Sequence, residues 1–257
     1  MSQSNSSTPI NEPIVSFRDV SFYYAPEGSA ATPRSGPEDP GEGETPPRAV
    51  DQPDEVVEVF SSLSLDLPAG VLSLVGENGT GKSTLLLLAA ARLFPTTGVV
   101  QLFDRDTRDF ANAAVDPELE EERNRYVSVV YQNMEFETEA PVGDLLGFVF
   151  ENGFHGKEAK DLPGEARRAL ELDGFLHKRA QELSKGELQR MILGFSVLYG
   201  SKLVVLDEPV FAVEPERQER AFDFLTQFAA DFSSSVYYSA HNLELTRKYS
   251  EYLLLFS

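Results

Sequence analysis

The 257-residue chain contains no cysteine, so it can form no disulfide framework and has no thiol for catalysis or metal binding. This absence fits a reducing compartment. Long apolar runs are also missing. The longest, such as residues 85–91, fall far short of the roughly 18 to 20 residues that a membrane span needs. Basic residues are scarce, with 22 Lys and Arg against 42 Asp and Glu, a formal net charge of −20. This charge argues against a nucleic-acid groove as the main surface and gives no general attraction to anionic lipids.

Two stretches lack the apolar residues needed to join a folded core. Residues 1–13 form a polar N-terminal segment without the basic and apolar pattern of a signal peptide, and we expect a loose leader. Residues 26–55 are rich in Pro, Gly, Glu and Asp, and cannot bury enough surface to offset the entropy of ordering. We interpret them as a disordered acidic insertion between two strands, a tolerated loop rather than a partner-docking arm.

The rest of the chain alternates between strand-like and helix-like patterns, and the chain as a whole is 41 % apolar. Strands are expected at residues 14–24, 56–67, 71–75, 99–103, 126–131, 202–208, 235–240 and 252–256. Helices are expected at residues 84–92, within 104–124, and at 142–150, 164–172, 187–199 and 215–232. Strands alternating with helices predict an α/β fold with a mainly parallel central sheet.

One motif dominates the sequence. Residues 76–83 read GENGTGKS, the G-x-x-x-x-G-K-S pattern of a phosphate-binding loop, with a strand before it and a helix after it. Small residues let successive backbone N–H groups turn inward around an anion, and the following helix adds its positive N-terminus. We expect Lys82 to reach the β- and γ-phosphates and Ser83 to ligate Mg²⁺. The residues assigned to nucleotide binding are Gly76, Asn78, Gly79, Thr80, Gly81, Lys82, Ser83 and Thr84.

A second signal lies at the end of an apolar strand, where Asp207 and Glu208 follow residues 203–206. Ligands of open α/β sheets collect at the carboxyl ends of strands. Asp207 is placed to hold Mg²⁺, and Glu208 is placed to polarise an attacking water as general base.

At residues 183–190 the chain reads LSKGELQR, which resembles the L-S-G-G-Q signature of the ABC ATPases. The motif order is also that of the family: phosphate loop, Gln132 after a strand, signature, Asp-Glu pair, then His241 after a strand. The resemblance covers residues 14–256. It implies a P-loop NTPase fold of ABC type, with a mainly parallel sheet, an N-terminal antiparallel β part and a helical subdomain.

The resemblance also implies roles for single residues. Tyr24 would stack on adenine, although Tyr23 or Phe22 could serve instead. Gln132 would sense Mg²⁺ and the attacking water, and His241 would contact the γ-phosphate. In the signature, Ser184 and Gly186 would contact a nucleotide held by a partner chain. His155 and His177 lack such a context and are interpreted as surface residues.

The implied organisation is a single ATPase domain over residues 1–257. Its core would comprise residues 14–132 and 184–257, and residues 133–183 would be the helical subdomain that grips a transmembrane transporter subunit. The family pairs two such domains head to tail around ATP and Mg²⁺. The chain would then work in the cytoplasm, peripheral on the inner face of the cell membrane, without a span of its own and without nucleic acid.

Four positions depart from the family pattern. Lys185 and Glu187 replace a glycine and a glutamine of the signature, while Phe211 and Glu214 follow the Asp-Glu pair where the family has a small residue and an aspartate. All four lie on surfaces that the family uses across its dimer. Either a homodimer tolerates the changes, or this chain pairs with a different ABC ATPase to make one good site and one weak site.

The leading interpretation is an ATP-hydrolysing subunit that powers transport through a separate membrane subunit. Residues 138–146 resemble those of importer ATPases of the energy-coupling-factor or cobalt kind, which suggests import. The alternative is a non-transport ABC ATPase that remodels a soluble assembly. A non-hydrolysing, ATP-gated adaptor is disfavoured by Glu208. The cargo, the direction of transport and the choice between homodimer and heterodimer are not encoded in these motifs.

Overall fold

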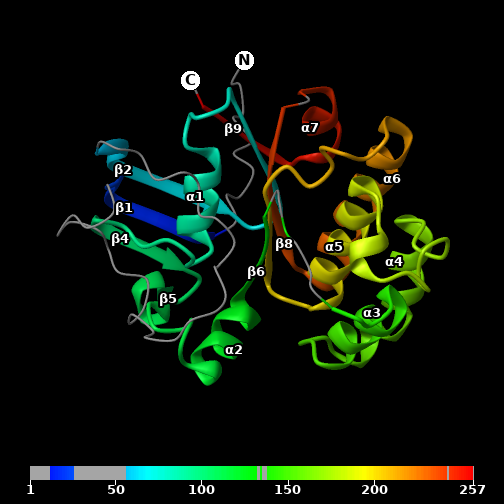
Figure 1. The fold of residues 1–257 in the computed structure, drawn as a ribbon. Helices are drawn as coiled ribbons and strands as arrows, with labels where there is room; N and C mark the ends of the chain where they lie inside the picture. The colour runs from blue at the N-terminus through cyan, green and yellow to red at the C-terminus, as the bar shows by residue number, and fades with distance from the viewer. Residues whose placement is uncertain (1–11, 26–55, 132–133, 135–137, 242, 257) are drawn as a thin grey trace, which may run out of the picture.

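The computed structural model describes residues 12–25, 56–131, 134, 138–241 and 243–256. Nearly all of the expected leader, the whole acidic insertion and Gln132 lie outside the described residues. Two sheets and a set of helices make up the fold (Figure 1). The α/β fold with an antiparallel N-terminal part, a parallel sheet and a helical part is therefore confirmed.

The antiparallel sheet has the strand order β2-β1-β4-β5. Its strands are β1 (Pro13–Tyr24), β2 (Val57–Pro68), β4 (Thr97–Leu102) and β5 (Arg105–Asp106). Strand β1 lies in the middle and pairs antiparallel with both β2 and β4. Val15 and Phe17 alternate inward and are fully buried, as expected for a sheet with one face against the core. A register shift follows at residues 17–20 and keeps Val20 and Phe22 on the buried face.

The second sheet is parallel throughout and has the order β6-β7-β8-β3-β9. Its strands are β3 (Val71–Val75), β6 (Val127–Val130), β7 (Leu203–Leu206), β8 (Ser235–Ala240) and β9 (Tyr252–Leu255). Strands β3 and β7 are buried at every position, because helices or the other sheet cover both faces.

Alternate residues of this sheet enter two different cores. Leu203, Val205 and Tyr237 pack toward the antiparallel sheet and helix α1 (Lys82–Ala89). Val204 and Tyr238, on the opposite face, pack toward the helices drawn at the right of Figure 1. These helices are α3 (Val142–Glu151), α4 (Leu162–Ala169), α5 (Lys185–Leu198) and α6 (Pro215–Phe232). Helix α2 (Pro117–Tyr126) leads into β6.

Sequence reasoning missed helix α7 (Leu243–Tyr249), which has too few residues to set a clear period. The interpretation of His155 as a surface residue is wrong. Its Nε2 lies 2.9 Å from the Val197 carbonyl oxygen, and its ring packs against Phe150 and Phe232. Burial lowers the pKa of His155, which favours the neutral form of its ring.

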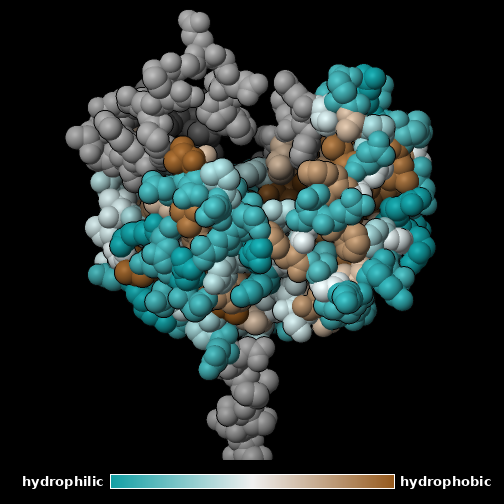
Figure 2. Space-filling model, turned by 90° about the horizontal axis from the view of Figure 1, so that it is seen from below, coloured by the Kyte–Doolittle hydropathy of each residue, from teal (hydrophilic) through white to brown (hydrophobic). Residues whose placement is uncertain are grey.

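Hydrophilic residues dominate the face seen in Figure 2, with smaller apolar areas between them. None of the described helices is long and apolar enough to cross a membrane.

Candidate nucleotide-binding site

Three neighbouring parallel strands bring the sequence motifs to one edge of the sheet. Strand β3 leads into the phosphate loop, β7 into Asp207 and Glu208, and β8 into His241. Val75 is in register with Ala240, and Leu206 is in register with Tyr238. Because the strands are parallel and adjacent, the residues that follow them meet at their carboxyl ends, where ligands of such sheets bind. A hollow of about 630 Å³ lies here, lined in part by Gly76, Thr80 and His241.

The phosphate loop has the backbone that its glycines allow. Gly79 and Gly81 have φ of 78° and 97°, a left-handed conformation that residues with a side chain rarely adopt. A Cβ on Gly81 would also lie only 2.9 Å from Val59 Cγ1. Gly81 is the N-cap of α1, whose first turn contains no acidic residue, so the helix presents an unopposed positive end.

Lys82 is only 6 % exposed, and its ammonium lies inside the loop. Its Nζ donates to the carbonyl oxygens of Gly76 and Glu77 at 2.9 and 2.6 Å. These bonds hold the positive charge next to the backbone that would surround a phosphate. The same helix brings Thr84 against the antiparallel sheet, where Tyr24 Oη lies 3.2 Å from Thr84 Oγ1.

The positions of Phe22, Tyr23 and Tyr24 distinguish between these three candidates for stacking on adenine. Tyr24 is partly exposed and lies beside the loop helix, with its ring edge-on to Phe22 at 5.0 Å. Phe22 is 3 % exposed and belongs to the core, so it is not available to a ligand. Tyr23 is partly exposed, but it alternates with Tyr24 and so points to the opposite face of β1.

The two carboxylates after β7 have different partners. Asp207 Oδ1 accepts a hydrogen bond from Ser239 Oγ at 2.5 Å. Glu208 Oε1 lies 2.6 Å from His241 Nε2, and Glu208 has a left-handed φ of 50°. The structure thus brings together Asp207, Glu208 and His241. Sequence reasoning overlooked Ser239, although a serine near the carboxyl end of a buried strand, two residues before the histidine, was a visible signal.

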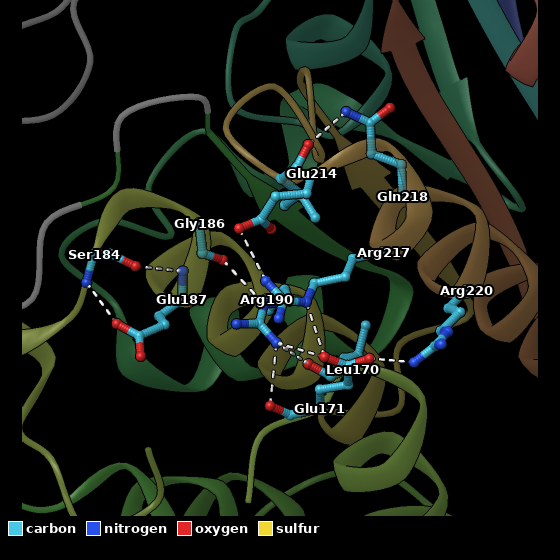
Figure 3. A network of polar contacts seen from close by, with 11 residues as sticks. Leu170, Glu171, Ser184, Gly186, Glu187, Arg190, Glu214, Arg217, Gln218 and Arg220 are labelled. Atoms are coloured by element: carbon cyan, nitrogen blue, oxygen red, sulfur yellow. Dashed lines mark hydrogen bonds and ion pairs between the residues drawn. The ribbon is translucent and has the colours of Figure 1, made fainter. Parts of the chain in front are cut away.

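The signature residues lie at the start of α5 (Figure 3). Ser184 is the N-cap: its Oγ accepts from the Glu187 N–H at 3.3 Å, and its own N–H donates to Glu187 Oε2 at 2.8 Å. This reciprocal pair is a capping box. Lys178 Nζ, 2.8 Å from Glu187 Oε1, and the Ser184 N–H lower the pKa of Glu187 to about 2. The Glu187 carboxylate therefore caps the N-terminus of helix α5.

Gly186 is required by close packing, because a Cβ there would lie 2.7 Å from the Ala212 carbonyl oxygen. Among the described residues, no hydrogen bond joins Ser184 or Gly186 to the phosphate loop of the same chain. The other two departures lie nearby. Phe211 is 71 % exposed, and Glu214 pairs with Arg217 at 2.9 Å. Lys185 is also exposed.

An arginine network ties this region together (Figure 3). Arg190 of α5 donates to the carbonyl oxygens of Leu170 and Glu171 at 2.9 and 3.1 Å. The Glu171 carboxylate accepts from Arg217 at 2.8 Å and also pairs with Arg220. Helix α5, the end of α4 and the start of α6 are therefore fixed to one another beside the loop at residues 208–214.

The residues present fit a magnesium nucleotide. The described residues contain no cluster of three or more His, Asp or Glu side chains that could hold a metal ion alone. Mg²⁺ bound with substrate phosphates does not need one, because it keeps several waters and takes one or two protein oxygens. Ser83 and Asp207 have hard oxygen atoms of the kind that Mg²⁺ prefers. The glycine loop and Lys82 have the backbone N–H groups and the positive charge that an anion would need.

These features define a P-loop nucleotide-binding protein. The sequence profile of the ABC transporter family matches residues 60–211, more than half of the chain. The chain therefore belongs to the ABC transporter family, as an ATP-binding and ATP-hydrolysing subunit.

Curated relatives are named as ATP-binding proteins of several transport systems. The lipoprotein-releasing system ATP-binding protein LolD of Rickettsia bellii is 26 % identical over 199 residues, which covers 77 % of this chain and 86 % of LolD. The zinc import ATP-binding protein ZnuC of Vibrio vulnificus is 29 % identical over 188 residues, 73 % of this chain and 63 % of ZnuC. YkoD of Bacillus subtilis is 27 % identical over 203 residues, and the match spans only 34 % of its length.

Solved structures agree on the fold. The ATP-binding cassette MJ0796, in a dimeric post-hydrolysis state with ADP and Pi, has a TM-score of 0.71 at 18 % identity, over 95 % of this chain and 94 % of its own. The protein cbiO1 of Clostridium perfringens has a TM-score of 0.65 at 16 % identity, over 96 % and 86 %.

Proposed function

We propose that this subunit binds Mg-ATP at the loop of residues 76–84 and hydrolyses it to drive motion in a separate transmembrane transporter subunit. The observation that carries the proposal is the convergence of the phosphate loop, the Asp207–Glu208 pair and His241 at one sheet edge. If the carboxylates were only a solvent-exposed pair, or the glycines only a turn, there would be no reason for these motifs to lie side by side.

The chemistry follows from the positions of the side chains. Lys82 would exchange its two carbonyl contacts for phosphate oxygens, and Tyr24 would stack on adenine. Glu208 would accept the proton of the attacking water, while His241 would contact the γ-phosphate. Ser83, Asp207 and Gln132 would hold Mg²⁺, which neutralises charge on the phosphates when bound. Gln132 lies outside the described residues, so its part rests on the motif order.

The working unit in this proposal is a head-to-tail dimer. Ser184 and Gly186 of one chain would close over the nucleotide of the other, as the head-to-tail pairing of the family implies. The exposed Phe211 and Lys185 would then face the partner. The partner would be either a second copy of this chain or a different ABC ATPase. A purified chain that dimerises with ATP and hydrolyses it at two equivalent sites would exclude the heterodimer.

The membrane partner would be gripped by the helical part, residues 133–183, between core segments 14–132 and 184–257. The subunit would then lie on the cytoplasmic face of the cell membrane. The names of LolD and ZnuC contain both release and import, so relatives at this distance do not decide the direction of transport. The resemblance of residues 138–146 favours import.

Co-purification tests the transport assignment. The tagged full-length chain is expected to bring down a multispanning membrane protein from detergent extracts, and ATPase activity should rise when that protein is present. The same capture with Glu208→Gln, in the presence of ATP, should strengthen the association. Recovery of only a soluble assembly, with ATPase activity intact, would favour the non-transport alternative.

A further inference from the structure

Ser239 is the polar exception at the carboxyl end of the central strand β8. The strand lies between β7 and β3, and Ser239 is 0 % exposed. Central strands of parallel sheets are mostly apolar, and a buried hydroxyl must find partners. Both partners of this hydroxyl lie in the proposed catalytic pair: Ser239 Oγ donates to Asp207 Oδ1 at 2.5 Å and accepts from the Glu208 N–H at 2.9 Å.

The strand register explains why one serine can serve both residues. Leu206 pairs with Tyr238, so Asp207 lies beside Ser239 on the neighbouring strand. The Asp207 N–H donates to Val130 of β6 at 2.9 Å, which continues the sheet, but the next N–H leaves this pattern. Glu208 turns into a left-handed conformation with φ of 50°, and its N–H points at Ser239.

A left-handed backbone at a residue with a side chain persists only where its surroundings hold it. The hydroxyl of Ser239 holds the N–H of Glu208, and the Gln189 side-chain amide donates to the Glu208 carbonyl oxygen at 3.3 Å. The Glu208 side chain then reaches His241, two residues beyond Ser239 on the same strand end. The Ser239 side chain thus contacts Asp207 and Glu208, and the Ser239 backbone leads directly to His241, two residues further on.

We propose that Ser239 is a positioning residue for ATP hydrolysis, which rests on the proposed function. Its hydroxyl fixes one oxygen of Asp207, the carboxylate that would help to hold Mg²⁺ in the proposed site. The same hydroxyl fixes the main chain of Glu208, and with it the starting point of the general base. No side chain of the phosphate loop takes part in these two bonds, so nucleotide binding without metal does not depend on them.

The test uses the full-length chain with Ser239→Ala, Ser239→Thr and the control Ser201→Ala. Ser201 is equally buried, and its hydroxyl bonds the Asn124 carbonyl oxygen at 2.6 Å, away from the acidic pair. The first readout is the affinity for a fluorescent ADP analogue, measured with EDTA and with MgCl₂. In Ser239→Ala the EDTA value should stay within twofold of wild type, while the gain from Mg²⁺ should fall about tenfold, as expected for a lost charge-assisted hydrogen bond.

The second readout is steady-state hydrolysis. Ser239→Ala should lower kcat by roughly tenfold to a hundredfold with KM for ATP nearly unchanged, because positioning rather than binding is lost. Ser239→Thr keeps the hydroxyl and should recover most of both losses, and Ser201→Ala should match wild type. If the threonine does not fit, the comparison of the two alanine variants decides.

If Ser239→Ala kept both the wild-type increase in nucleotide affinity on addition of Mg²⁺ and the wild-type kcat, the positioning role would be overturned. The proposed function would remain intact. A similar loss in Ser201→Ala would also overturn it, since general destabilisation would then explain the effect. A wild-type chain that binds no nucleotide in either condition would instead remove the proposed function itself.

Discussion

His241 Nε2 lies 2.6 Å from Glu208 Oε1, although the two residues are 33 positions apart in the chain. The pair forms because β7 and β8 are parallel neighbours that end at the same edge of the sheet. The Glu208 side chain is 14 % exposed and the His241 side chain is 42 % exposed, so the histidine is the more solvent-exposed member of the pair. In the proposed mechanism, the residue that would accept a proton and the residue that would contact the γ-phosphate are thus in direct contact.

Glu208→Gln tests the base directly. The amide keeps the shape and can still bond His241, but it cannot take a proton from water. Turnover should fall at least a hundredfold, within the range for loss of a general base, while ATP affinity stays within a few-fold of wild type. Phosphate release and equilibrium ATP binding measure the two effects. Unchanged hydrolysis would exclude Glu208 as the base.

The position of the phosphate loop and of the acidic pair at the sheet edge could be predicted from the sequence, because each directly follows an apolar strand. Residues 71–75 and 203–206 are buried at every position, which leaves a run of apolar letters that is easy to recognise. Parallel pairing then forces the residues after these strands together. The phosphate loop, Asp207 and Glu208 could therefore be predicted to lie at one sheet edge without coordinates, whereas His241 was added through the family resemblance.

What the sequence could not provide was the set of partners made by tertiary contact. Ser239 matters through strand register, and His155 is held by a carbonyl 42 residues away. Helix α7 covers too few residues for a period to stand out. In the sequence, Glu187 was only a departure from the signature pattern. In the structure, it forms a capping box with Ser184 and an ion pair with Lys178.

Lys82→Ala should separate phosphate binding from base binding. The variant removes the ammonium that lies in the loop, so ATP affinity should fall roughly tenfold or more, the scale of a charge-assisted contact. Affinity for adenosine, which has no phosphate, should not change. Titration with both ligands measures the difference, and the exposed Lys160→Ala is the control. An equal loss for both ligands would indicate a collapsed loop instead of a missing charge.

Gly186→Ala tests the close approach between α5 and the loop after Glu208. The new Cβ would lie 2.7 Å from the Ala212 carbonyl oxygen, so one of the two segments must shift. We expect a loss of about 1 to 3 kcal/mol in the free energy of unfolding, typical of overpacking. Gly147→Ala is the matched control, because it lies on helix α3 with no atom within 4 Å of the added Cβ.

In Gly147→Ala the stability should stay equal or rise by up to about 1 kcal/mol, because alanine favours a helix over glycine. Urea denaturation of both variants gives the comparison. A neutral Gly186→Ala would mean that the contact with Ala212 yields without cost, and that glycine is not needed there for packing.

Glu187→Gln should make stability less dependent on pH. The pKa of Glu187 is lowered from 4.5 to about 2 in the folded chain by Lys178 and by the Ser184 N–H. The ionised carboxylate therefore stabilises the fold fully above about pH 4.5, and this contribution is lost as the pH falls toward 2. The pair is partly exposed, so we expect only about 0.5 to 1 kcal/mol.

Urea unfolding of the two proteins between about pH 7 and pH 2.5 measures this contribution. The difference in unfolding free energy should be largest near neutral pH and should shrink steadily below pH 4.5. Lys178→Met removes the same ion pair from the other side and should show the same trend. A difference that stays constant across this range would mean that the carboxylate acts through its shape in the capping box and not through its charge.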